Sequence, residues 1–212
     1  MPKIVDWDQR RDEILSATGR VIARDGIAGA TIRAIAREAN CSRGILGHYF
    51  DDKADILGSA LVHSHRRVGA RMTQASAGRT GLDALRRVML EALPLDDRRD
   101  LEAQIEISFW ARALGNAPMR DLQHSEFDRL SARLREHLDE AAQQGELGSD
   151  CDLDLATHQL LVLIDGLSAQ RVLYPDRVTP QRQIEMLDRL LGGFRSLAPV
   201  PEAGVGAAAD AG

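Results

Sequence analysis

Apolar residues recur at steps of three and four positions along almost the whole chain, and glycine, proline, asparagine and aspartate separate the periodic segments. This spacing is typical of helices with one buried face. A β-strand would instead need alternating apolar and polar residues with many β-branched side chains, and no segment has that pattern. The spacing therefore predicts an all-α protein of about nine helices.

The predicted helices fall into two groups followed by a tail. Short helices with tight turns are expected within residues 8–68, and longer helices within residues 74–197. Hydrophobic residues make up 44% of the chain and charged residues 28%, so both groups can build a buried core. Residues 198–212 are rich in Ala, Gly and Pro, a composition that predicts disorder.

The most informative stretch is TIRAIAREANCSRGILGHYFDDK, residues 31–53. Thr31 and Ser42 stand where two helices would begin, and their hydroxyls can accept hydrogen bonds from unpaired backbone N–H groups. A short helix, a tight turn and a second helix of about two turns form a helix-turn-helix at residues 31–50. The second helix of such a motif can lie in the DNA major groove, which is about 12 Å wide.

The second helix has the composition that a DNA-reading helix needs. Arg43 can bond bidentately to guanine, and small residues beside it let the backbone approach phosphates and base edges. We expect Ile45 and Leu46 to pack back on the preceding helix. A purely structural helical pair is the alternative interpretation. The predicted DNA contacts are Thr31, Ser42, Arg43, Gly44, Gly47, His48, Tyr49 and Lys53.

This stretch resembles the DNA-binding domain of the TetR family of bacterial transcriptional regulators. The resemblance rests on Gly26, Thr31, Ile35-Ala36, Ser42, Gly44, Ile45-Leu46, the HYF run at 48–50, and Lys53. Many members of the family have tyrosine at the position of Gly47. The small residue here resembles the BetI-like branch of the family, and so do the FWA motif at 109–111 and the LIDGL motif at 163–167.

The resemblance implies a three-helix DNA-binding domain, followed by a helical domain that dimerises and binds a small-molecule effector. It implies phosphate contacts from Thr31, Tyr49 and Lys53. It also implies base or mixed contacts from Ser42, Arg43, Gly44 and His48.

Five residues of the second group are candidates for the effector pocket. Trp110 lies beside Phe109 in a predicted helix, and Glu106 precedes Trp110 by four residues on the same helical face. An aromatic face with a carboxylate would suit a cationic effector. Core packing of Trp110 and a solvent-facing Glu106 are the alternatives. The candidates are Glu106, Phe109, Trp110, Phe127 and Asp165, where Asp165 could equally be a partnered interface residue.

The last two predicted helices are candidates for a homodimer interface. Residues 160–167 are apolar on nearly every side, which indicates burial against several neighbours. Two helices from each subunit would form a four-helix bundle, and a two-fold dimer would read two half-sites. The predicted interface residues are Leu160, Leu163, Leu167, Leu187, Leu190, Leu191 and Phe194.

These observations predict a repressor that binds double-stranded operator DNA and is released by an effector of unknown identity. Effector binding would shift the fourth helix and change the spacing of the two recognition helices. An activator with the same fold, and a helical ligand-binding protein with no DNA role, are the alternatives.

Other classes of function find no support in the sequence. No Ser/His/Asp or HExxH spacing points to an enzyme, and no motif implies a cofactor. Cys41 and Cys151 lie far apart without metal-ligand spacing, which favours a reducing cytoplasm. No run approaches the roughly 20 apolar residues of a membrane span.

The formal net charge of −5 hides a division along the chain. Residues 1–71 hold 12 basic and 9 acidic side chains, whereas residues 72–212 hold 15 and 23. Because DNA-binding domains are usually basic, this division is consistent with an N-terminal DNA-binding domain joined to an acidic remainder.

Overall fold

The computed structural model describes residues 7–195 and contains nine helices within them, which confirms the all-α prediction. The helices are α1 (Trp7–Gly29), α2 (Ile32–Glu38), α3 (Arg43–Tyr49), α4 (Lys53–Ser76), α5 (Gly81–Ala92), α6 (Asp97–Ala113), α7 (Ala117–Gln143), α8 (Leu153–Leu173) and α9 (Pro180–Arg195). The predicted disordered tail, residues 198–212, lies outside the described residues.

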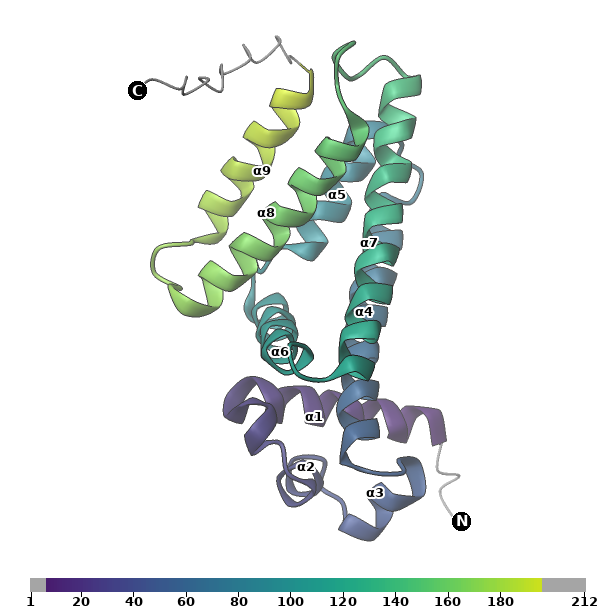
Figure 1. The fold of residues 1–212 in the computed structure, drawn as a ribbon, viewed down its shortest axis with the longest axis vertical. Coiled ribbons are helices and arrows are strands. Elements are labelled where there is room, and N and C mark those ends of the chain that lie inside the picture. Colours follow the sequence, from purple (N-terminus) through teal and green to yellow (C-terminus); the bar gives the residue numbers. More distant parts are fainter. Residues whose placement is uncertain (1–6, 196–212) are drawn as a thin grey trace, which may run out of the picture.

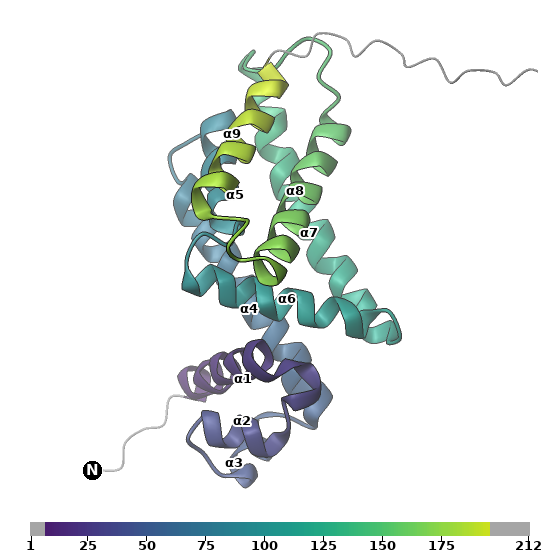
Figure 2. The same ribbon diagram turned by 90° about the vertical axis from the view of Figure 1, so that its left-hand side faces the viewer.

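The molecule is elongated, with a small cluster of helices at one end and a taller bundle at the other (Figure 1). Helices α1, α2 and α3 form the cluster, and α4 begins beside them and continues upward into the bundle. Helices α5, α7, α8 and α9 complete the bundle, and α6 crosses between the two parts (Figure 2). One continuous helix therefore connects the predicted DNA-reading end to the rest of the chain.

Local capping explains where most helices begin. The hydroxyls of Thr31 and Ser42 accept hydrogen bonds from the backbone N–H groups of Ala34 (3.2 Å) and Ile45 (3.3 Å). Asp52 caps α4 in the same way, through the N–H of Asp55 at 2.8 Å. Each cap satisfies a backbone donor that has no partner inside its helix.

Two separate hydrophobic cores hold the described chain together. The first core unites α1, α2, α3 and the start of α4, and it also includes Ile105 and Phe109 of α6 and Met119 of α7. The second core lies among α5, α7, α8 and α9, and it includes Met72 of α4. Helix α6 thus belongs to the second group in sequence but contributes one face to the first core.

Helices α1 and α6 approach each other closely at Gly19. A Cβ atom added at Gly19 would lie 2.8 Å from Cδ1 of Ile105, which is too close for ordinary van der Waals contact. The absence of a side chain at this position therefore lets α6 rest directly on α1. This contact joins the DNA-reading end to the bundle at a second place besides α4.

Candidate DNA-reading surface and ligand cavity

The turn between α2 and α3 orients the second helix of the predicted helix-turn-helix. Asn40 has a positive φ of 48°, a conformation that asparagine tolerates better than most residues. Leu46 and Phe50 are buried against α1 and α2 in the first core. Because these side chains anchor one face of α3, the opposite face is presented to solvent.

The exposed face of α3 contains most of the predicted DNA contacts. Arg43, Gly44, Gly47 and His48 are exposed, as is the Ser42 cap. A Cβ atom at Gly47 would meet no atom within 4 Å, so this glycine is not required by packing. It leaves the backbone of α3 bare at the centre of the surface, where a nucleic acid could approach closely.

Ile45 departs from the sequence prediction that it packs back on the preceding helix. Only Leu46 does so, at 2% exposure, whereas Ile45 is 38% exposed beside Arg43. An exposed aliphatic side chain on this face can contact the methyl group of thymine. Ile45 and Leu46 are adjacent in the helix, so their side chains point in different directions. This adjacency was the sequence signal that Ile45 would be exposed if Leu46 is buried.

The remaining predicted contacts flank α3. Tyr49 is half-buried, and its ring centroid lies 4.9 Å from that of Trp7. Lys53 Nζ lies 3.5 Å from the Ile27 carbonyl oxygen, and Thr31 is exposed at the start of α2. Both residues stand at helix N-termini near α3, where backbone N–H groups also favour phosphate.

Arginines on this surface differ from two arginines of α1 in whether they form ion pairs. Arg20 and Arg24 both bind Glu38, at 2.8 and 3.0 Å. Arg33 and Arg43 are exposed and, within residues 7–195, form no ion pair. Positive charge is therefore available where α2 and α3 face solvent.

A cavity of about 170 Å³ lies between α4, α6, α7 and α8. Three of the five predicted effector-pocket residues line it, namely Glu106, Trp110 and Asp165. Phe109 is fully buried in the first core, because it lies on a different face of α6 from Glu106 and Trp110, which line the cavity. Phe127 is 44% exposed and lines a separate open depression.

His65 bridges two carboxylates at this cavity. Its Nε2 atom lies 2.5 Å from Glu106 of α6, and its Nδ1 atom lies 3.0 Å from Glu126 of α7. Trp110 Nε1 donates to the other oxygen of Glu106 at 2.9 Å. We call His65, Glu106 and Glu126 the His65 bridge, because it ties α4 to two neighbouring helices.

The electrostatics of the His65 bridge favour the imidazolium. Burial opposes the charged form of His65, but its hydrogen bonds to Glu106 and Glu126 outweigh that effect and raise its pKa to about 9. The same contact with His65 lowers the pKa of Glu126. Asp165 has no such partner, so burial and the nearby Glu106 carboxylate raise its pKa to about 6.

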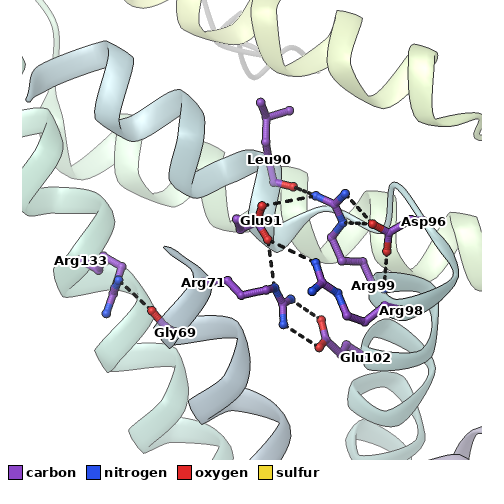
Figure 3. Close-up of polar contacts among 9 residues, drawn as sticks. All are labelled: Gly69, Arg71, Leu90, Glu91, Asp96, Arg98, Arg99, Glu102 and Arg133. Carbon is purple, nitrogen blue, oxygen red and sulfur yellow. Dashed lines mark hydrogen bonds and ion pairs between the residues drawn. The ribbon is translucent and has the colours of Figure 1, made fainter. Parts of the chain in front are cut away.

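The opposite end of the cavity is held by arginines (Figure 3). Arg71 of α4 binds Glu102 at 2.5 Å and Glu91 at 2.9 Å, which connects α4 to α6 and α5. Arg133 donates to the Gly69 carbonyl oxygen at 3.3 Å, without a carboxylate partner in the described chain. Helix α4 therefore contacts its neighbours through charged groups above and below the cavity.

Sequence reasoning missed the role of His65 and Glu126. The signal for His65 was present, because Leu61, Val68 and Met72 lie four before, three after and seven after it on one helical face. A histidine within such an apolar stripe needs a partner for its ring nitrogens. Which helix would supply that partner depends on tertiary structure alone.

The predicted dimer residues lie largely inside the single chain. Five are buried in the second core, and Leu163 and Leu190 pack partly against it. The apolar side chains that α8 and α9 present to solvent are instead Leu155, Val162, Leu173 and Met186. A homodimer built on these helices stays a prediction, with the exposed group as its contact surface.

The described residues hold no cluster of three or more His, Cys, Asp or Glu side chains that could bind a metal ion. Within the same part of the chain, no helix combines the length and apolar character needed to cross a membrane.

A pH-dependent stability is expected from the His65 bridge. Its folded pKa of about 9 lies above the ordinary value of 6.5, so the bridge stabilises fully below about pH 6.5 and loses this contribution as the pH rises through 9. The free energy of unfolding of the wild type, relative to His65→Gln, should fall by at most about 3 kcal/mol over that interval. Urea denaturation at several pH values measures it.

A matched control for this measurement is His124→Gln, which changes an exposed histidine of the helix that carries Glu126. His124 forms no ion pair in the described part of the chain, so this substitution should not reproduce the pH-dependent loss expected for His65→Gln. A difference between His65→Gln and the wild type that stays constant with pH would contradict the protonated bridge.

Comparison with known proteins assigns the class of this molecule. Residues 14–60 match the family described as bacterial regulatory proteins, tetR family, and residues 81–195 match the BetI-type transcriptional repressor C-terminal family. The chain is 32% identical over 183 residues to the transcriptional regulator PksA of Bacillus subtilis, covering 86% of this chain and 88% of that protein. It is 30% identical over 171 residues to the regulator BetI of Burkholderia ambifaria, covering 79% and 84%.

A solved structure extends the comparison to the fold. The transcriptional regulator from Saccharomonospora viridis, crystallised in complex with choline, has a TM-score of 0.79 and 25% sequence identity, and the match covers 87% of this chain and 96% of that one. The molecule is a DNA-binding transcriptional regulator, not an enzyme. The chain belongs to the TetR family and has a BetI-type C-terminal domain, as its sequence motifs predicted.

Proposed function

We propose that this regulator is a homodimeric repressor that an organic cation releases from its operator. The exposed face of α3 is the observation that carries the DNA-binding half, because Arg43, Gly44, Gly47 and His48 lie together there without protein partners covering them. The family membership supports double-stranded operator DNA as the partner.

The cavity supports the class of effector. Trp110 offers an aromatic ring, and Asp165 offers a carboxylate without a hydrogen-bond partner in the described chain. A cation is favoured by both groups, through the ring face and through opposite charge. The related structure from Saccharomonospora viridis contains choline, which is a cation of this kind.

The geometry of α4 supports a route from the cavity to DNA. The helix begins at Lys53, directly after α3, and passes His65, Gly69 and Met72 at the cavity wall. A ligand that displaces these residues would move α4, and with it the separation of the two recognition helices in a dimer.

Selection of bound duplexes from a random pool tests the proposal. The purified chain should enrich a near-palindromic sequence, and choline chloride or another organic cation should weaken the complex in a gel-shift assay. A reporter fused to that operator separates repression from activation. Enrichment of no duplex would overturn the DNA-binding proposal, and strict monomers in sedimentation would overturn the dimer.

Lys53→Ala should weaken binding to all duplexes to a similar extent. Lysine near a helix N-terminus would neutralise a phosphate and read no base, so its loss should reduce the salt dependence of log Kd by about one unit per subunit. Fluorescence anisotropy at several salt concentrations measures this slope. A loss confined to the selected operator would instead show that Lys53 reads sequence.

A further inference from the structure

The His65 bridge is built from groups on three helices. Both ring nitrogens of His65 face carboxylate oxygens, at 2.5 Å for Glu106 and 3.0 Å for Glu126. A neutral imidazole has only one N–H, so both contacts can be hydrogen bonds only when the ring is an imidazolium. The geometry thus places one positive charge of the protein itself at the wall of the cavity.

The two carboxylates have no free capacity for a second cation. The remaining oxygen of Glu106 accepts from Trp110 at 2.9 Å, and Glu126 also binds Arg129 at 2.7 Å. A cationic ligand that approaches Trp110 therefore meets a carboxylate already neutralised by His65. The imidazolium and the ligand would compete for the same negative charge.

Building on the proposed function, we propose that the effector cation takes the place of the His65 charge at Glu106 and Glu126. The ligand keeps its charge, His65 gives one proton to the solvent, and the net charge of the cavity is unchanged. Neutral His65 can donate to only one carboxylate, so α4 loses a tether to α6 or α7. Effector binding thereby loosens the attachment of α4, the helix that follows α3, to its neighbours.

The charged surroundings of His65 support this exchange. Glu106 faces it from α6, Glu126 and Arg129 from α7, and Asp165 approaches Glu106 from α8. On α4 itself, His63 and Arg66 turn toward α1, where they pair with Asp12. The two carboxylates thus favour the imidazolium, whereas burial of the ring opposes it.

The size of the proton release follows from the two states of His65. With a pKa of about 9 the ring is almost fully protonated at pH 7.5. Once a cation occupies the carboxylates, burial alone keeps the pKa at or below its ordinary value of 6.5, so about 0.9 of a proton leaves per site. Asp165, with a pKa of about 6, adds little above pH 7.5.

Isothermal titration calorimetry of the full chain tests the exchange, with choline chloride and tetraethylammonium chloride as probes. Titrations at pH 7.5 in phosphate and in Tris, which differ in ionisation enthalpy, count the protons released. We expect about 0.9 per site, and a Kd that falls about tenfold from pH 7 to pH 8.

Two variants separate the exchange from a merely structural role of the histidine. His65→Gln should bind the probe without proton release and with a Kd that is independent of pH, and the probe should no longer weaken its operator complex. His137→Gln removes another histidine–glutamate pair, 3.1 Å from Glu140 and outside the cavity, and should keep the wild-type proton count.

The possible results are distinct. A probe that binds and releases the operator with fewer than about 0.2 protons per site overturns the exchange and leaves the proposed function intact. If neither probe nor any other organic cation binds, the proposed effector class fails and the exchange with it. The proton count uses the wild-type chain, so a misfolded His65→Gln would not remove the test.

Discussion

Operator affinity should fall by roughly 30-fold to 10⁴-fold when Arg43 is replaced by alanine. Arg43 is exposed at the start of α3, beside the bare backbone of Gly44 and Gly47. A bidentate contact of arginine with guanine contributes about 1–3 kcal/mol, and the proposed dimer presents two copies. Fluorescence anisotropy with the selected operator measures the loss at one fixed salt concentration.

Two control variants divide this effect into charge and geometry. Arg87→Ala removes an exposed arginine of α5, far from α3, and should leave operator affinity within about twofold. Arg43→Lys keeps the charge but loses the planar fork, so it should retain non-specific binding and lose base preference. Wild-type specificity in Arg43→Lys would show that Arg43 contacts phosphate only.

Phe109→Ala should lower the free energy of unfolding by about 3–5 kcal/mol. The side chain is fully buried in the first core, where α6 packs on α1, and its removal leaves a cavity among buried neighbours. Urea denaturation at pH 7 measures the loss.

Phe127→Ala is the matched control for this variant. The same substitution at a side chain that is 44% exposed should cost less than about 1 kcal/mol. A loss below about 1 kcal/mol for Phe109→Ala too would mean that the contact between α1 and α6 contributes little to the folded state.

The sequence predicted the features that depend on local interactions. Helix periodicity, the caps at Thr31 and Ser42, and the helix-turn-helix all rest on residues within a few positions of one another. The face of a single helix was harder to assign. Phe109 and Trp110 are adjacent in α6 but point about 100° apart, so one enters the first core and the other lines the cavity.

Tertiary neighbours explain what the sequence could not predict. Leu160, Leu187 and Leu191 form apolar stripes that correctly indicate burial, but a stripe does not reveal whether the same chain or a second copy covers it. His65 and Glu126 are 61 positions apart, and no local rule brings them together. These placements follow from how α4, α6, α7 and α8 surround the cavity.

The close contact of α6 with α1 bears on how regulators of this type could be recombined. A chimera that joins residues 7–76 to the sensor of another regulator would place a foreign helix against Gly19, where the side chain of Ile105 packs close to the backbone of α1. A clash or a gap at the contact between α1 and α6 would uncouple ligand binding from operator binding. Functional exchange of the DNA-reading head therefore requires α6 residues Ile105, Phe109 and Ala113 to be transplanted with it.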